Sequence, residues 1–322
     1  MVLDDFELAL RAFQESRILL TAIELNVFTA VEGGATAEEA ARRLGTSPRA
    51  TGMLLNALVA LELLRKRGDV FENGPLAARF LADGSPENAR PAMLHLAYRW
   101  HTWSTLTDRV RGIRPPEEFR SLDPSRYEAL LAMLDRGARE RAPGLVAAIG
   151  TQGVRRLLDI GGGSAAYSIA FASAGPDIEA EVLDLPEVVA ITKRYIVKSG
   201  LADRVRARAG DLLSDEFGSG YDLILMFSVA HLLGEQENRS VLERCRRALA
   251  PGGRVAIRDH ILDASKTAPR AGAIFALNML VATHNGGAYS YDEYASWLRD
   301  AGFGDVERRE IKGPTSVIIA MR

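Results

Sequence analysis

The pattern of apolar and polar positions divides the chain into two parts with different periodicity. In residues 6–64, apolar side chains recur every three or four positions, which predicts amphipathic helices. From 154 to 261, short apolar runs alternate with helical stretches, which predicts parallel strand–helix–strand units in a doubly wound sheet. Residues 305–311 and 316–321 read as two more strands, and the short link between them requires an antiparallel pair. The pattern therefore predicts an α/β fold, preceded by a mainly helical domain.

The first 100 residues carry the signals of a winged helix. Apolar spacing over 6–29 fits two helices separated near Ser16 or Asn26. Thr36-Ala37-Glu38-Glu39 is a capping box, and Ser47-Pro48 begins a second helix that runs to about residue 64. A hairpin through Gly68-Asp69 follows. Helix, turn, helix and hairpin in this order predict a winged-helix-like domain over 1–100, with 101–322 as the second domain.

A winged helix raises a DNA-binding regulator as an alternative function. A helix that reads DNA needs polar and basic residues on its exposed face. The helix over 49–61 is instead apolar nearly all round, and the formal net charge of the chain is −2. This favours burial of the helix against a second subunit, and it argues against nucleic acid or an anionic membrane as the main partner. We expect a homodimer held by the N-terminal domain.

The most informative stretch lies around residue 160. An apolar run, 154–160, ends in Gly161-Gly162-Gly163, and a helix of small residues follows. Such a turn lets the backbone approach a nucleotide-like ligand. Asp159 precedes the glycines, where it could hold a ligand ammonium group, and Asp184 follows the next strand, where a carboxylate accepts hydrogen bonds from ribose hydroxyls. Asp211 follows a third strand. A nicotinamide dehydrogenase is the rival, and both Asp159 and the terminal hairpin argue against it.

Five segments in order carry a family resemblance: Asp-x-Gly-Gly-Gly, Val-Leu-Asp-Leu-Pro-Glu-Val, Gly-Asp-Leu-Leu, Tyr-Asp-Leu-Ile-Leu and Leu-Ala-Pro-Gly-Gly-Arg. Together they resemble the class I S-adenosylmethionine-dependent O-methyltransferases of the plant caffeate and isoflavone type, which include bacterial polyketide enzymes. The resemblance covers nearly the whole chain. It implies a seven-stranded Rossmann-like sheet, S-adenosyl-L-methionine as cofactor, and a small aromatic or polyketide-like acceptor whose hydroxyl is methylated. The cofactor-binding residues that follow are Asp159, Gly161, Gly163, Asp184, Leu185, Gly210, Asp211, Leu212, Phe227 and Ser228.

Methyl transfer to a hydroxyl needs a base beside the cofactor. His231 follows the strand over 223–229, and histidine has the right pKa range for a base near neutral pH. Asp259 ends the neighbouring strand and can orient the imidazole from its other nitrogen. The resembled family keeps a histidine at position 231, usually followed by Asp-Trp, whereas Leu232-Leu233 stands here. The alternatives are a structural histidine and a solvated strand-end acid.

The acceptor pocket is expected to lie beneath a roof of helices in the segment 101–150, which the pattern breaks at Arg114-Pro115-Pro116. Aromatic and histidine side chains between 94 and 103 fit either core packing or substrate lining. The resembled family has a second glutamate that orients the histidine, and Tyr289 stands at its position in this chain. The second orienting carboxylate is therefore missing here. A member that has lost methyl transfer, decarboxylase- or hydroxylase-like, therefore stays an alternative. The predicted substrate-binding residues are Met133, Asn278, Met279, His284 and Tyr289, with His284 as an alternative base.

Composition narrows the class of protein and its cellular compartment. Hydrophobic residues make up 47% and charged residues 25% of the chain, which is typical of a globular protein. The single cysteine, Cys245, fits a reducing compartment, and the N-terminus shows no signal-peptide pattern, so we expect a cytoplasmic protein without a membrane span. The five histidines show no spacing typical of metal ligands, and no metal is expected.

Overall fold

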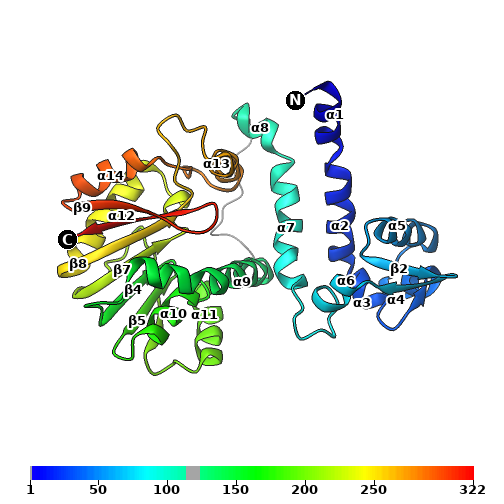
Figure 1. The fold of residues 1–322 in the computed structure, drawn as a ribbon, viewed down its shortest axis with the longest axis horizontal. Coiled ribbons are helices and arrows are strands. Elements are labelled where there is room, and N and C mark those ends of the chain that lie inside the picture. Colours follow the sequence, from blue (N-terminus) through cyan, green and yellow to red (C-terminus); the bar gives the residue numbers. More distant parts are fainter. Residues whose placement is uncertain (1, 114–123) are drawn as a thin grey trace. The chain divides into compact units, whose positions relative to one another are not determined.

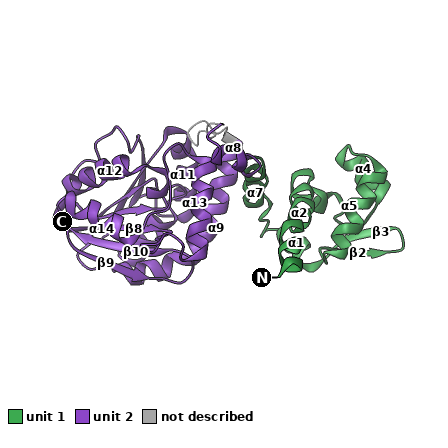
Figure 2. Cartoon of the chain, turned by 90° about the horizontal axis from the view of Figure 1, so that it is seen from above, with its two compact units in different colours: residues 1–101 green, residues 102–322 purple. Residues whose placement is uncertain are grey.

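The computed structural model describes residues 2–113 and 124–322, so the predicted break at Arg114-Pro115-Pro116 lies outside the described residues. The chain forms two compact units, Met1–His101 and Thr102–Arg322 (Figure 2). Across the described ranges, no helix combines the length and the apolar character that crossing a membrane requires.

The first unit is mainly helical, with one small antiparallel sheet of order β1-β3-β2. The predicted helix break at Asn26 is confirmed, because this residue has a φ of 61° between α2 and α3. The other break falls at Ala12 and not at Ser16. Its elements are α1 (Leu3–Arg11), α2 (Phe13–Leu25), α3 (Val27–Ala30), β1 (Ala35–Thr36), α4 (Ala37–Leu44), α5 (Pro48–Ala60), β2 (Leu64–Arg67), β3 (Val70–Asn73), α6 (Pro75–Phe80) and most of α7 (Arg90–Trp103).

Local signals explain where these helices begin. Thr36 accepts a hydrogen bond from the Glu39 backbone, and the Glu39 carboxylate accepts one from the Thr36 backbone, so the predicted capping box is confirmed. Pro48 starts α5 as expected, although Ser47 makes no side-chain capping bond. Helix α1 buries none of its residues within the single chain, and Met53 on α5 is 61% exposed.

The second unit contains a seven-stranded sheet of order β6-β5-β4-β7-β8-β10-β9 (Figure 1). The pairs among β6, β5, β4, β7 and β8 are parallel, whereas β10 pairs antiparallel with both β8 and β9. The predicted fold, a mostly parallel sheet with an antiparallel C-terminal hairpin, is confirmed. The strands are β4 (Arg156–Ile160), β5 (Glu179–Asp184), β6 (Val205–Ala209), β7 (Tyr221–Phe227), β8 (Leu249–Asp259), β9 (Gly304–Glu310) and β10 (Ser316–Met321).

Helices cover both faces of this sheet and create two cores. One core joins the sheet to α9 (Pro124–Ile149), α10 (Ala166–Ala174) and α11 (Pro186–Ser199), around Leu145, Phe171 and Ile196. The other joins it to α12 (Glu235–Ala248) and α14 (Tyr291–Asp300), around Val241 and Trp297. Short α8 (Leu106–Val110) and long α13 (Arg270–Ala282) complete the unit. The strand order reverses between β4 and β7, which is where ligands bind in such sheets.

Candidate active site

The turn after β4 is built for close approach of the backbone to neighbouring groups. Gly161 and Gly163 have φ values of 66° and 55°, a region that glycine enters without steric cost. A Cβ at Gly161 would lie 2.6 Å from Val229 Cγ2, and one at Gly162 would lie 2.7 Å from Asp159 Cγ. Glycine is therefore required here by packing as well as by conformation. The turn leads into the N-terminus of α10, where backbone N–H groups favour a polar ligand.

Asp159 lies directly beneath this turn and is 1% exposed. The Ser168 hydroxyl donates a hydrogen bond of 2.7 Å to its Oδ2 atom. Burial raises the pKa of Asp159 to about 7, and the hydroxyl of Ser168 only partly opposes this. Its predicted contact with a ligand ammonium group stays a prediction, and in this structure the carboxyl supports the turn from below.

Asp184 ends β5 beside the glycine turn. Its Oδ2 accepts a hydrogen bond of 2.8 Å from the Gly163 N–H, and its Oδ1 accepts one of 2.8 Å from the Leu185 N–H. Burial raises the pKa of Asp184 to about 6, against the pull of these two donors. A carboxylate offers about four acceptor positions, so capacity is left for two ribose hydroxyls. The predicted cofactor fits this arrangement of acid and glycine turn.

The remaining predicted cofactor residues lie at the same edge of the sheet. The Gly210 N–H donates to the Asp184 carbonyl at 2.9 Å, and Asp211 Oδ1 accepts from the Leu213 N–H at 2.8 Å. Leu212 is half-buried. Phe227 ends β7 and meets the Tyr167 ring edge-on, with centroids 4.9 Å apart. Ser228 follows with a φ of 59°, a strained value for a residue other than glycine.

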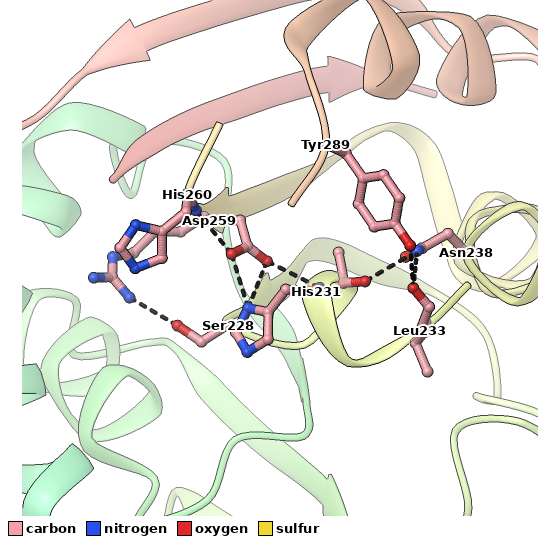
Figure 3. A network of polar contacts seen from close by, with 9 residues as sticks. Ser228, His231, Leu233, Asn238, Asp259, His260 and Tyr289 are labelled. Atoms are coloured by element: carbon pink, nitrogen blue, oxygen red, sulfur yellow. Dashed lines mark hydrogen bonds and ion pairs between the residues drawn. The ribbon is translucent and has the colours of Figure 1, made fainter. Parts of the chain in front are cut away.

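His231 and Asp259 form a buried pair at this edge, as predicted from the two strand ends. His231 lies on a short 3₁₀ turn, η2 (Ala230–Leu232), after β7. Its Nδ1 atom is 2.8 Å from Asp259 Oδ1, and its backbone N–H donates to Oδ2 at 3.2 Å (Figure 3). Burial alone would raise the pKa of Asp259, but His231 and the His260 N–H outweigh it and hold the pKa below its usual value. An ionised Asp259 places the proton of neutral His231 on Nδ1 and leaves Nε2 as an acceptor.

Three groups hold the turn that carries His231, and the sequence assigned a role only to Tyr289 among them. Asn238 on α12 is 1% exposed, and its Nδ2 donates to the carbonyls of Ala230 and Leu233 at 3.0 and 3.2 Å. The Tyr289 hydroxyl donates to the same Leu233 carbonyl at 2.5 Å (Figure 3). The Gly287 N–H donates to the His231 carbonyl at 3.0 Å. Tyr289 is thus bonded to the backbone of the turn, and its predicted role in substrate binding stays a prediction.

Space beside the turn is limited by a second glycine. A Cβ at Gly286 would lie 2.3 Å from the His231 carbonyl oxygen and 2.6 Å from Thr283 Oγ1. No side chain fits at position 286 without displacing one of these atoms. The segment after α13 and the turn after β7 are therefore packed directly against each other.

Aromatic packing fixes the plane of the imidazole from another side. The Phe275 ring on α13 meets His231 edge-on, with centroids 4.8 Å apart, and stacks on His260 at 4.0 Å. Burial lowers the pKa of His260, which keeps that ring neutral. His260 therefore packs as an aromatic ring against the face of Phe275.

The predicted acceptor residues lie on α9, α13 and the loop that follows α13. Asn278 Oδ1 accepts a hydrogen bond of 2.8 Å from Trp103 Nε1, and the Arg109 guanidinium on α8 donates to the Leu280 carbonyl at 2.7 Å. These bonds fix α13 within the unit. Met279 is buried, His284 is exposed, and Met133 is half-buried on α9. The structure brings Asn278 and Met279 together on one helix, whereas His284 lies in the loop beyond it.

In ranges 2–113 and 124–322, no three His, Cys, Asp or Glu side chains lie close enough together to hold a metal ion. Cys245 is fully buried, which raises the pKa of its thiol to about 12.

Comparison with known proteins gives the family. An O-methyltransferase domain model matches residues 130–304, and an O-methyltransferase dimerisation domain model matches residues 7–83. The 3-hydroxy-5-methyl-1-naphthoate 3-O-methyltransferase of Streptomyces sahachiroi is 34% identical over 312 residues, which cover 93% of this chain and 89% of that protein.

Solved structures agree in fold. An O-methyltransferase family protein from Burkholderia thailandensis superposes with a TM-score of 0.90 at 26% identity, covering 100% of this chain and 98% of the other. The structure described as PigF with SAH also gives a TM-score of 0.90, at 25% identity, and covers all of both chains. The chain is a member of the O-methyltransferase family and an enzyme of that class, with S-adenosylmethionine as its methyl donor.

Proposed function

We propose that this enzyme transfers a methyl group from S-adenosylmethionine to a hydroxyl group of a small aromatic or polyketide-like molecule, with His231 as general base. The observation that carries the proposal is the buried His231–Asp259 pair at 2.8 Å, at the sheet edge that also carries the glycine turn and Asp184. A relative that is 34% identical acts on a hydroxynaphthoate, which supports a planar aromatic acceptor.

When bound, S-adenosylmethionine supplies an activated methyl group on a sulfonium. The work left to the protein is alignment of the acceptor, exclusion of water and removal of a proton. Asp259 holds the proton of His231 on Nδ1, so Nε2 is free to take the acceptor proton. As His231 becomes positively charged, the neighbouring Asp259 carboxylate stabilises that charge. Asp184 would hold the ribose hydroxyls of the bound cofactor, and the backbone of the glycine turn would lie against it.

The departures from the family sequence leave a base with one carboxylate partner and a rigid turn. Leu232 and Leu233 replace the usual Asp-Trp, but the Leu233 carbonyl anchors both Asn238 and Tyr289. We therefore favour methyl transfer over the decarboxylase- or hydroxylase-like alternative, because the base and its orienting acid are assembled. The roof of the acceptor pocket is assigned to α9 and α13, with Met133, Asn278 and Met279 as its lining.

We also propose that the enzyme is a homodimer held by the first unit, which has a winged-helix-like arrangement and no role in DNA binding. Its match to a dimerisation domain supports this. Apolar side chains on α1 support it as well, because Leu3 and Leu8 are 69% and 72% exposed in the single chain. Light scattering should find twice the chain mass, and a stable monomer at micromolar concentration would contradict the assignment.

The direct test of the activity uses methyl-labelled S-adenosylmethionine with a panel of phenols, among them 3-hydroxy-1-naphthoate and 2-naphthol. Mass spectrometry should find one labelled methyl group on the hydroxyl oxygen. A labelled carbon or nitrogen atom, or loss of carbon dioxide without label, would replace the proposed reaction with another. A parallel incubation with the His231→Gln variant measures background transfer.

A further inference from the structure

Arg258 is a buried cation whose hydrogen bonding is incomplete. It is 5% exposed, and the hydrogen bond from Nη1 to the Ser228 hydroxyl, 2.9 Å long, is the one that its side chain makes to the described residues. Its Nε atom is buried without a partner, and none of the described carboxylates forms an ion pair with it. Removing a charge from water without compensation is costly, so such a group is rarely kept for stability alone.

The position of Arg258 in β8 puts it at the ligand edge of the sheet. It is the residue before Asp259, and its Cα is paired in register with Phe227, the last residue of β7. Successive side chains of a strand point to opposite faces. Ala256 belongs to the core on the α9 and α10 side, whereas Ile257 belongs to the other core. Arg258 therefore faces α10, and the Asp259–His231 pair faces away from it.

The side chains near Arg258 are aromatic and basic, and the neighbouring acid, Asp259, is paired with His231. Its guanidinium carbon lies 6.0 Å from the centroid of Tyr167, in the first turn of α10. A second arginine, Arg141 on α9, also has a buried Nε without a partner. Burial lowers the pKa of Arg258, and the charge of Arg141 lowers it as well, against the opposing effects of Tyr167 and Asp259. Two guanidinium groups with incomplete hydrogen bonding, one of them beside the first turn of α10, favour binding of an anion.

Resting on the proposed function, we propose that Arg258, supported by Arg141, binds a carboxylate of a ligand held at this edge. A carboxylate matches the forked donors of a guanidinium and satisfies the charge that the chain leaves uncompensated. Two sources have this chemistry. One is the methionyl carboxylate of the cofactor, which the position on the α10 side favours. The other is an acidic acceptor such as a hydroxynaphthoate.

The test measures binding, by calorimetry, of S-adenosylhomocysteine and of its carboxamide analogue, which keeps the shape and loses the charge. In Arg258→Met, S-adenosylhomocysteine should bind roughly 30-fold more weakly or worse, while the carboxamide should lose little. Arg258→Lys should recover part of the loss. The matched control is Arg254→Met on the same strand, because Arg254 lies four residues before Arg258, donates to the Gly150 carbonyl and should change neither affinity.

A second arm identifies the acceptor as the source. If S-adenosylhomocysteine binds Arg258→Met normally, but 3-hydroxy-1-naphthoate binds it at least tenfold more weakly while 2-naphthol is unaffected, the carboxylate belongs to the acceptor. Without ligand, Arg258→Met should melt no lower than the wild type, because it removes an uncompensated buried charge.

The outcomes separate the two levels of the proposal. Equal affinities of wild type and Arg258→Met for all four probes would overturn the inference and leave the methyltransferase function intact. So would an equal loss for charged and neutral probes together with a lower melting temperature. A wild-type protein that binds neither S-adenosylhomocysteine nor its carboxamide would overturn the proposed function, and this inference with it.

Discussion

Two buried aspartates at the same edge of one sheet have pKa values that are shifted in opposite directions. Asp159, at the end of β4, and Asp259, at the end of β8, are each 1% exposed. Burial raises the pKa of Asp159 to about 7, the charge of Asp184 adds to this, and the hydroxyl and backbone of Ser168 oppose it. At Asp259 a histidine and two backbone N–H groups overcome the same burial and lower the pKa. Burial alone therefore does not set the charge of a carboxyl group, and the neighbouring charges and hydrogen-bond donors decide.

The largest expected effect concerns His231, the hydrogen-bond partner of Asp259. Replacing His231 by Gln removes the proposed base, and turnover on a weakly acidic alcohol should fall roughly 10²–10⁴-fold. Affinity for S-adenosylhomocysteine should stay within about twofold, because the proposed cofactor contacts lie on other residues. Steady-state kinetics and calorimetry check the two halves. Wild-type turnover in the variant would make His231 structural and turn attention to His284.

Asp259→Asn should lower turnover less than His231→Gln, because it disturbs the orientation of the imidazole but keeps the base. Loss of the carboxylate also removes the group that stabilises protonated His231. Steady-state kinetics of the two variants side by side measure the difference. Turnover of Asp259→Asn equal to that of the wild type would show that Asp259 does not orient the base.

The contributions of the two aspartates to the stability of the fold should depend on pH with opposite sign. Asp159 has a folded pKa above its unfolded value of 3.8, so unfolding releases protons and stability falls as the pH rises from about 4 to about 7. Asp259 has a lowered folded pKa, so its contribution is present above pH 3.8 and is lost as the pH falls below it.

Urea unfolding of the matched pair measures this difference. At pH 8, Asp159→Asn should be as stable as the wild type or more stable by roughly 1–3 kcal/mol, because it removes a buried charge and keeps an acceptor for Ser168. Asp259→Asn should be less stable at the same pH. Equal destabilisation of both variants would show that the two sites differ less than their donors suggest.

Cofactor binding should depend on pH through Asp184. Its pKa of about 6 means that the carboxyl takes up a proton as the pH falls below 6, and a protonated carboxyl loses acceptor capacity for ribose hydroxyls. Affinity for S-adenosylhomocysteine should therefore decrease by up to tenfold per unit below pH 6. Calorimetry between pH 5 and 8 checks this, and Asp184→Asn should bind weakly with no such dependence.

The smallest expected effect lies in the support of the turn. Tyr289→Phe removes one hydrogen bond to the Leu233 carbonyl and should lower the free energy of unfolding by roughly 1 kcal/mol. Turnover should fall only severalfold, because Asn238 still holds the same carbonyl. Urea unfolding and kinetics measure both values. A loss as large as that of His231→Gln would place Tyr289 in the chemistry itself.

The His231–Asp259 pair was predictable from sequence because both residues follow neighbouring parallel strands, whose ends must meet at one edge. Asn238 was missed because one polar residue in a polar helix gives no signal of burial. Tyr289 stood where an acid was expected, and only the fold shows its hydroxyl bonded to the turn. Arg258 did leave a signal, a cation at the end of the apolar run 255–257. The missing counter-charge, however, is a property of three dimensions.

The contact between Gly286 and the His231 carbonyl has a consequence for how substrate range can change in evolution. Helix α13, which we propose lines the acceptor pocket, is where mutations would reshape that pocket, and it continues into the loop that carries Gly286. A Cβ at position 286 would lie 2.3 Å from the His231 carbonyl oxygen, so this position cannot hold any residue larger than glycine. Mutations along α13 can therefore accumulate only while the loop keeps its place. A saturation library over 274–288 should recover variety on the helix and glycine alone at 286.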